Sequence, residues 1–168
     1  MIYWENDQDK LEINEELYKI VEQIAEYSFR QEGLTIDWEL SITLVDNETI
    51  KEINSRFRNI QSATDVLSFP MLDYPSGKVF KECFKDNIFR DEDMDEGKLV
   101  MGDIVISIER ALEQSVEFNH GFVREVCYLV IHSILHLLGY DHMERSDKEK
   151  MRTREEEILS KFDLSRGA

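Results

Sequence analysis

The sequence predicts a single α+β domain in which a small mixed sheet of about four strands is packed by five or six helices. Two observations support this prediction. The chain has 168 residues, of which 42% are hydrophobic, and it contains no internal repeat or flexible linker that would divide it. Segments with the periodicity of helices alternate along the chain with segments that have the periodicity of strands.

The first half of the chain is predicted to alternate between helices and strands. Apolar residues recur at helical spacing in two segments, each preceded by an asparagine or aspartate that can cap a helix. Two further segments have the alternation or the short apolar run of a strand. We therefore expect a helix from Asn14 to about Gly33, a strand over 38–44, a helix capped by Asp46 or Asn47, and a strand over 66–69 that Pro70 ends.

The second half begins with an irregular segment. Residues 73–97 are rich in charges and contain one Pro-Ser-Gly turn, so they are predicted to form a hairpin excursion or a mobile lid. Regular patterns follow. We expect a strand over 99–106, a helix capped by Ser107, a helix over 122–138 that is apolar on nearly every face and therefore buried, and a last helix opened by the capping-box pattern of Ser146 to Glu149.

The charge of the chain limits its classes of function. The formal net charge is −16 and the pI is near 4.6. Proteins that bind nucleic acid over a long track usually have a basic face, so this acidity argues against extended nonspecific binding. It does not exclude cleavage of a short segment, because a small cationic cleft can exist on an acidic body. The acidic runs 91–96 and 155–157 are expected to be exposed.

Other features of the sequence indicate a cytoplasmic protein that does not enter a membrane. No stretch of about 18 apolar residues is present, and the segment Met1–Lys10 is acidic and polar, unlike a signal peptide. Cys83 and Cys127 are too few and too far apart for a disulfide framework, and Cys127 is expected in the core. Nothing in the sequence specifies an oligomeric state.

Three of the four histidines lie within residues 132–142 at a spacing that is typical of a metal site. His132 and His136 are four residues apart, so on a helix they lie on the same face and can both reach one cation. Gly139 is placed to end that helix in a left-handed conformation, which lets the chain reverse. The reversal can bring His142 to the same ion.

The number of ligands favours a catalytic zinc site. Three neutral imidazoles without a fourth protein ligand leave one position for water, whereas structural zinc sites have four protein ligands. Zinc can lower the pKa of a bound water to about 7 and can polarise a carbonyl or phosphoryl oxygen. The sequence therefore predicts one Zn²⁺ ion held by His132, His136 and His142. His120 has no partner in sequence and is expected to be a solvated turn residue.

The residue after the first histidine argues against peptide hydrolysis. The same histidine and glycine frame occurs in metzincin peptidases, which carry a glutamate directly after the first histidine as the general base. Here that position is Ser133. Because a serine hydroxyl does not take up a proton near neutral pH, the metal frame is present without the base of the usual peptidase route.

With these residues in view, the chain resembles the YbeY family of bacterial single-strand endoribonucleases. The family hallmark is His-Gly-x-Leu-His-Leu-x-Gly-Tyr-Asp-His, and residues 132–142 differ from it only at Ser133. Asn54–Arg58 and Thr64–Pro70 resemble two further blocks of the family, with Phe57 in place of a tyrosine. Residues 102–107 resemble its Gly-Asp-Ile strand. The likeness covers the chain from about Trp38 to the last helix and implies a single YbeY-like metallohydrolase domain over residues 1–168, with a metzincin-like zinc helix.

The resemblance also implies roles for individual residues. It implies three zinc ligands, His132, His136 and His142, and an essential arginine at Arg58. A guanidinium can bind phosphate oxygens in a fork and offset the charge that develops during phosphodiester cleavage. Asp141 and Asp103 are candidate acceptors for the N–H groups of metal-bound imidazoles, and Asp65 and Ser68 are candidates for shaping the cleft.

The resemblance further implies that the substrate is ribosomal RNA, including the 3′ end of 16S rRNA, that the cellular role includes ribosome quality control, and that the ribosome or small-subunit proteins are partners. Whether zinc hydroxide or the 2′-hydroxyl of the RNA attacks stays open. Two other functions stay open as well. One is a zinc peptidase or amidase whose base comes from elsewhere, such as residues 91–96. The other is a metal-stabilised ribosome assembly factor without catalysis.

Overall fold

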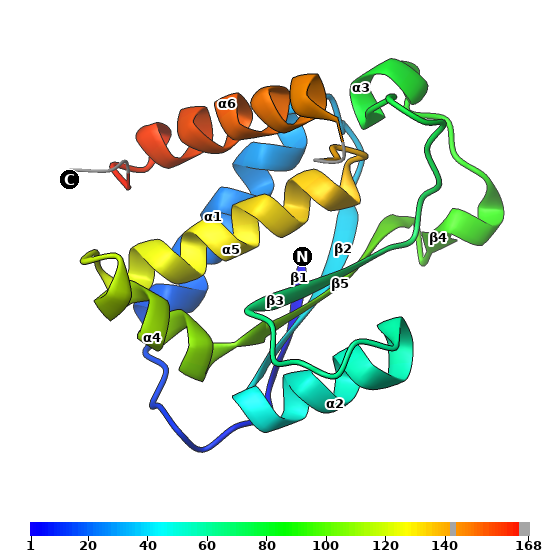
Figure 1. The fold of residues 1–168 in the computed structure, drawn as a ribbon. Helices are drawn as coiled ribbons and strands as arrows, with labels where there is room; N and C mark the ends of the chain where they lie inside the picture. The colour runs from blue at the N-terminus through cyan, green and yellow to red at the C-terminus, as the bar shows by residue number, and fades with distance from the viewer. Residues whose placement is uncertain (142–143, 165–168) are drawn as a thin grey trace.

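The computed structural model describes residues 1–141 and 144–164 of the chain (Figure 1). The prediction of one small α+β domain with a mixed sheet and five or six helices is confirmed, and the sheet has five strands. The elements are β1 (Ile2–Asn6), α1 (Glu15–Gln31), β2 (Trp38–Val45), α2 (Asn47–Arg58), β3 (Val66–Pro70), α3 (Phe80–Cys83), the 3₁₀ helix η1 (Asp91–Asp93), β4 (Met94–Asp95), β5 (Lys98–Ser107), α4 (Ile108–Glu117), α5 (Phe122–Leu137) and α6 (Arg145–Lys161).

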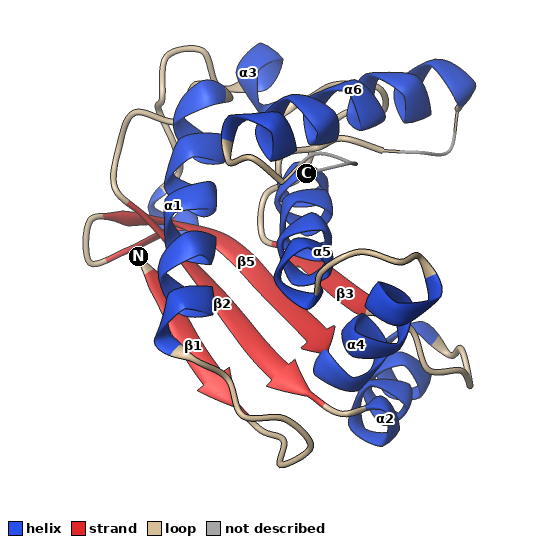
Figure 2. Cartoon of the chain, turned by 90° about the vertical axis from the view of Figure 1, so that its left-hand side faces the viewer, coloured by secondary structure: helices blue, strands red, loops and turns tan. Residues whose placement is uncertain are grey.

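The sheet is mixed because its strands run in both directions. Its order is β1-β2-β5-β3, and β4 pairs with β5 beside this path. β1, β2 and β5 are parallel, whereas β3 and β4 are antiparallel to β5 (Figure 2). The strand β1 was not expected from the acidic N-terminal segment. It is short and lies at the edge of the sheet, so only Ile2 and Trp4 pack on the core and the apolar pattern is weak.

The two faces of the sheet are covered unequally. On one face, alternate residues of β2 and β5, such as Ile42 and Ile104, pack in one large core against α1 and α5. On the other face, Val105 and Leu67 form a small core with Ile50 of α2. Figure 1 shows α1, α5 and α6 on one side of the sheet and α2 on the other. The end of α2 and the end of α5 therefore approach β3 from different sides.

Most of the predicted helix starts are correct. The side chains of Asn14, Asp46 and Ser107 each accept a hydrogen bond from a backbone N–H of the first turn, at 3.1, 2.8 and 3.2 Å. The predicted capping box of Ser146 is wrong. A cap at Ser146 would start the helix at Asp147, but α6 starts two residues earlier, at Arg145, and no side chain caps it, so Ser146 lies inside the first turn.

The segment 73–97 is packed on the core along part of its length. Val79 and Phe80 are buried, and the Tyr74 hydroxyl and the Phe80 N–H donate to carbonyls at the end of α5, both at 2.8 Å. The segment ends in the short β4 and β5 hairpin, which agrees with the hairpin alternative. Gly139 is the neighbour that allows this packing. Its φ is +91°, and an added Cβ would lie 2.9 Å from the Lys78 carbonyl oxygen and the Tyr74 ring.

The cysteines agree with the sequence interpretation, but the acidic runs do so only in part. Cys83 and Cys127 are both free thiols, and Cys127 is buried, which raises the pKa of its thiol to about 12. Asp93 and Glu155 are buried although they belong to runs that were expected to be exposed. Within residues 1–141 and 144–164, no helix has both the length and the apolar character that crossing a bilayer requires.

Candidate active site

His132 and His136 lie on one face of α5, as their spacing predicts. Their ring centroids are 4.6 Å apart and the rings are nearly perpendicular. The two Nε2 atoms face each other at 3.1 Å. Both rings are only partly buried, so this face of the helix opens toward solvent while its other faces lie in the core.

The hydrogen bonds of the two Nδ1 atoms assign the tautomers of both rings. His132 Nδ1 lies 3.1 Å from Oε2 of Glu155, and His136 Nδ1 lies 3.0 Å from the carbonyl oxygen of Tyr140. A carboxylate and a carbonyl can only accept, so each Nδ1 carries the proton. In the neutral form of each ring, Nε2 then presents a lone pair toward the other imidazole.

This pair of nitrogens fits a metal ion. Two imidazoles bound to one tetrahedral zinc at about 2.0–2.1 Å have nitrogens roughly 3.3 Å apart, close to the observed separation. Nδ1–H groups that donate to a carboxylate and a carbonyl are the usual support of zinc-binding histidines. Within the described part of the chain, no cluster of three His, Cys, Asp or Glu side chains is placed to hold a metal. The third predicted ligand, His142, lies outside the described residues.

A cleft of about 480 Å³ lies beside the two histidines. It brings residues of three distant segments together: the end of α2, the strand β3 with the loop before it, and α5 with the turn after it. Its walls are formed by Arg58, Thr64, Asp65, Val66, Ser68, Pro70, Tyr128, Leu129, His132, His136 and Asp141. The arginine and the Thr64–Pro70 block that the sequence singled out thus face the histidine pair.

Arg58 is positioned without a carboxylate. It is the last residue of α2, and its Nη2 donates to the carbonyl oxygen of Ser68 at 2.9 Å. The guanidinium carbon lies 5.7 Å from the centroid of the Phe69 ring. In the ranges that the structure describes, Arg58 forms no ion pair, so its charge is not neutralised by the chain.

The carboxylates near the cleft have different surroundings. Oδ1 of Asp65 accepts from the Val66 N–H at 2.8 Å, and its Oδ2 accepts from Gln114 Nε2 at 3.2 Å, which holds the loop before β3. Asp141 is exposed and lines the cleft. Asp103, by contrast, is exposed on β5 and does not line the cleft, so Glu155 rather than Asp103 supports the histidine pair.

Two further side chains limit the chemistry of the cleft. Ser133 is fully buried and does not line the cleft, so its hydroxyl is not presented to a substrate. Tyr128 lines the cleft beside His132, with ring centroids 6.0 Å apart. Burial, with a further contribution from Glu155, raises the pKa of Tyr128 to about 12. Its hydroxyl therefore keeps its proton near neutral pH.

The Gly-Asp-Ile block has a structural part in this site. Gly102 has a φ of +136°, and an added Cβ would lie 2.2 Å from the carbonyl oxygen of Phe69 and 3.2 Å from Leu137. The glycine thus lets β3 and α5 pack closely against β5. This close packing places β3, whose Ser68 carbonyl accepts a hydrogen bond from Arg58, next to α5, which carries His132 and His136.

One residue of the site and one residue near it differ from the sequence interpretation. Glu155 was expected to be exposed, yet it lies four residues after the buried Met151 and three before the buried Ile158. That helical spacing was the signal for an inward-facing glutamate. His120 was expected to be solvated, but its ring is largely buried and its Nε2 forms a short hydrogen bond with Glu125.

The fold and the site define a class: a small α+β domain with a paired-imidazole cleft that an arginine faces. The family model described as endoribonuclease YbeY matches residues 3–163. The endoribonuclease YbeY of Clostridium botulinum strain Langeland is 57% identical over 166 residues, which cover 99% of this chain and 100% of that protein. The chain therefore belongs to the YbeY endoribonuclease family, as the sequence resemblance implied.

Other comparisons agree with this membership. The endoribonuclease YbeY of Clostridium botulinum strain Hall is 56% identical over 166 residues, again across 99% of this chain and the whole of that protein. The solution structure of TM1509 from Thermotoga maritima is 27% identical in sequence and has a TM-score of 0.57. That alignment covers 97% of this chain and 92% of TM1509, so the likeness extends over the whole fold.

Proposed function

We propose that this protein is a zinc-dependent, single-strand-specific endoribonuclease. Its single zinc ion is held by His132, His136 and His142, and Arg58 binds the phosphate that is cleaved. The observation that carries the proposal is that Arg58 and the paired Nε2 atoms line one cleft. The names of the relatives support RNA as the substrate.

The charges in the cleft suit an anionic substrate. Although the protein has a net charge of −16, the guanidinium of Arg58 is left without a carboxylate partner among the described residues. One N–H group of the guanidinium donates to the Ser68 carbonyl, and the group lies over the Phe69 ring. Its remaining N–H groups can therefore donate to phosphate oxygens. These charge-assisted hydrogen bonds strengthen as negative charge develops on the phosphate.

Other side chains have supporting tasks in this proposal. The Tyr128 hydroxyl, which stays protonated, can donate to an oxygen of the substrate. Asp65 holds the wall of the cleft, because both of its oxygens accept hydrogen bonds. A bound zinc ion supplies Lewis-acid polarisation of a phosphoryl oxygen. Asp141 is the other carboxylate that lines the cleft and is the residue to test as the proton acceptor.

The cellular role that we propose is the processing of ribosomal RNA in the cytoplasm, including maturation of the 3′ end of 16S rRNA, together with ribosome quality control. The ribosome or proteins of its small subunit would hold the RNA for the enzyme. Such partners would also compensate for the acidity of the chain, which does not favour binding of a long RNA without help.

Metal content and RNA cleavage, measured on the same samples, test the proposal. The wild type is expected to contain zinc and to cleave single-stranded RNA, and His136→Ala is expected to lose both. Arg58→Ala should keep the metal and lose at least about a hundredfold in kcat/KM, because it removes the charge that stabilises the transition state. Arg56→Ala is the matched control, since Arg56 is exposed on the same helix and does not line the cleft.

The rival functions predict other outcomes. Cleavage of peptides that disappears in His136→Ala, together with intact RNA, would establish a peptidase or amidase. No residue of 91–96 lines the cleft, so the structure offers no base from that run for such a reaction. A non-catalytic assembly factor predicts that Arg58→Ala leaves cellular rRNA processing unchanged while the histidine variants lose stability.

The attacking group can be identified from the products. If the 2′-hydroxyl of the RNA attacks, the products end in 2′,3′-cyclic phosphate and a substrate with deoxyribose at the cleavage site is not cut. Cleavage of the deoxyribose substrate at the normal rate would exclude this route.

A further inference from the structure

A second cavity adjoins the candidate active site. It has a volume of about 370 Å³ and lies between α4, α5 and α6. Tyr128 and His132 line both this cavity and the cleft, so the two spaces are adjacent and share these side chains as a boundary. Along α5, Arg124, Tyr128, His132 and His136 follow one another at intervals of four residues, which places them in one stripe on the helix.

Arg124 is the unusual group in this second cavity. The residue is 9% exposed, and among the described residues its Nε has no hydrogen-bond partner. The one hydrogen bond that its side chain forms with the described residues is a long contact of 3.5 Å from Nη1 to Nδ1 of His120. Across residues 1–141 and 144–164, Arg124 forms no ion pair with a carboxylate. A buried guanidinium without an anion is costly, so its presence on a cavity wall points to an anionic ligand.

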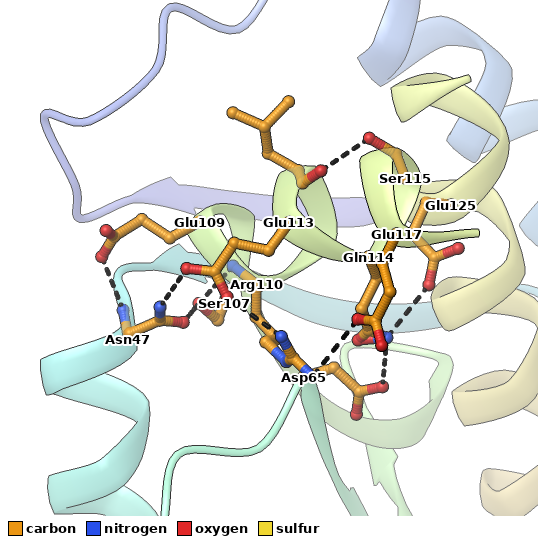
Figure 3. Close-up of polar contacts among 11 residues, drawn as sticks. Asn47, Asp65, Ser107, Glu109, Arg110, Glu113, Gln114, Ser115, Glu117 and Glu125 are labelled. Carbon is orange, nitrogen blue, oxygen red and sulfur yellow. Dashed lines mark hydrogen bonds and ion pairs between the residues drawn. The ribbon is translucent and has the colours of Figure 1, made fainter. Parts of the chain in front are cut away.

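Three carboxylates line the cavity, and among the described residues none of them forms an ion pair with Arg124. Glu156 of α6 is one of them, and hydrogen bonds direct the oxygens of the other two elsewhere. Glu125 binds His120 Nε2 through Oε2 and accepts from Gln114 Nε2 through Oε1 at 3.3 Å. Gln114 in turn joins Glu125 to Asp65, as Figure 3 shows. Glu155 binds Nδ1 of His132. These bonds direct the two glutamates toward histidines and leave the guanidinium unpaired.

The rim of the cavity has groups that suit a nucleotide. Lys148 and Arg152 of α6 are exposed, and neither side chain has an ion pair in the described ranges. Phe118 is 57% exposed, and its ring stacks on His120 with centroids 6.0 Å apart and an interplanar angle of 26°. Cations around a phosphate site and an exposed aromatic ring are the elements with which proteins bind single-stranded nucleic acid.

We propose that this second cavity binds a phosphate of the RNA strand that flanks the phosphate held in the cleft, with Arg124 as its main ligand and Phe118 as a stacking surface for a base. This inference rests on the proposed function, because the RNA strand would pass from Arg58 over the histidine pair to Arg124. It makes the second cavity a substrate-binding subsite, and it assigns Arg124 a role in binding rather than in cleavage.

RNA binding tests this proposal directly. The probe is a fluorescein-labelled oligouridylate, measured by anisotropy with the zinc-loaded protein at several salt concentrations. Arg124→Met is expected to bind about tenfold more weakly, since a hydrogen-bonded charge contact is lost. The slope of log K against log salt should fall by about 0.7 for the phosphate contact removed. Lys19→Gln, which removes an exposed charge from α1, should bind as the wild type does.

Two further measurements separate binding from a structural role. The dinucleotide UpU has one phosphate and cannot occupy both sites, so Arg124→Met should cleave it at the wild-type rate. The thermal midpoint of Arg124→Met should not fall, because the variant removes an unpaired buried charge. Arg152→Gln changes an exposed residue and is expected to weaken binding of the oligouridylate without altering UpU cleavage. The proposal would be overturned if Arg124→Met cleaved UpU as poorly as it binds the oligouridylate and also had a lower thermal midpoint than the wild type.

The outcomes also distinguish this inference from the proposed function. If the wild type cleaves RNA and Arg124→Met binds the oligouridylate with unchanged affinity, the subsite is wrong while the endoribonuclease stands. If the wild type binds but does not cleave RNA, and Arg124→Met loses binding, the subsite stands without the activity. Unchanged RNA affinity together with lost binding of a polyglutamate peptide would overturn the RNA subsite in favour of a protein partner.

Discussion

Two arginines on neighbouring helices have opposite surroundings. Arg154 of α6 donates to the buried Glu32 from Nε at 2.8 Å and from Nη2 at 2.6 Å, and it also pairs with Glu157. Arg124 of α5 is more buried than Arg154 but has no carboxylate partner among the described residues. Both guanidiniums are at least partly buried, but among the described residues only Arg154 is paired with carboxylates.

The difference separates a charge that is paired within the fold from charges that have no carboxylate partner among the described residues. Glu32 is fully buried and also accepts from the Tyr140 hydroxyl at 2.7 Å, with Lys81 at 3.8 Å. Burial and the bond to Glu32 raise the pKa of the Tyr140 hydroxyl, so it remains a donor. This cluster fixes the turn whose carbonyl orients His136. Arg58 in the cleft and Arg124 in the second cavity have no carboxylate partner among the described residues, and the proposed phosphate sites rest on this difference.

The largest expected effect concerns Glu32, the carboxylate that pairs with Arg154. Glu32→Ala should lower the free energy of unfolding by about 3–5 kcal/mol, because it leaves Arg154 partly buried without its main partner. Urea unfolding followed by circular dichroism measures this loss. The double variant Glu32→Leu with Arg154→Met is the control and should lose less, since it removes both charges. A loss of under about 1 kcal/mol in Glu32→Ala would show that the cluster is not a structural support.

Glu155 is a buried carboxylate like Glu32, but its partner is a histidine of the candidate active site. It accepts a hydrogen bond from Nδ1 of His132. Glu155→Gln should weaken zinc binding about 10- to 100-fold, since a carboxylate that accepts from a ligand histidine fixes its tautomer and increases its basicity. Competition with a chromophoric chelator measures the affinity. Glu156→Gln, which alters the adjacent residue of α6, is the matched control. Equal affinities in both variants would remove Glu155 from the metal site.

The smallest expected effect concerns the helix that carries Arg58. Asp46→Ala should cost about 1 kcal/mol at neutral pH, because it removes the cap of α2. Hydrogen bonds from Thr49 lower the pKa of Asp46 below its ordinary value of 3.8. The stabilisation is therefore complete above about pH 4 and is lost as the pH falls through the lowered pKa.

Unfolding free energies of wild type and Asp46→Ala at several pH values test the helix cap. The difference between the two proteins should shrink in acid. Glu52→Ala, at an exposed position in the middle of α2, should give a difference that lacks this acid dependence. A difference for Asp46→Ala that stays constant down to acidic pH would contradict the assignment of the carboxylate as the cap.

Local patterns allowed most of the fold to be predicted. The helix caps at Asn14, Asp46 and Ser107 and the periodicity of α1, β2 and α5 depend on residues a few positions apart. The strands β1 and β4 were missed because each is short and depends on its neighbour for pairing. The packing of 73–97 on the end of α5 was missed for the same reason, since Tyr74 and Leu137 are far apart in sequence.

The sequence by itself determined the histidine pair on one helical face, the glycine turn after it and the family to which the chain belongs. Only the tertiary structure decided that Arg58, Glu155 and Arg124 surround that pair, and which charges stay without a partner. The reason is physical. A helical repeat sets the neighbours of a residue within one turn, whereas contacts between α2, α5 and α6 depend on how those helices pack around a shared sheet and core.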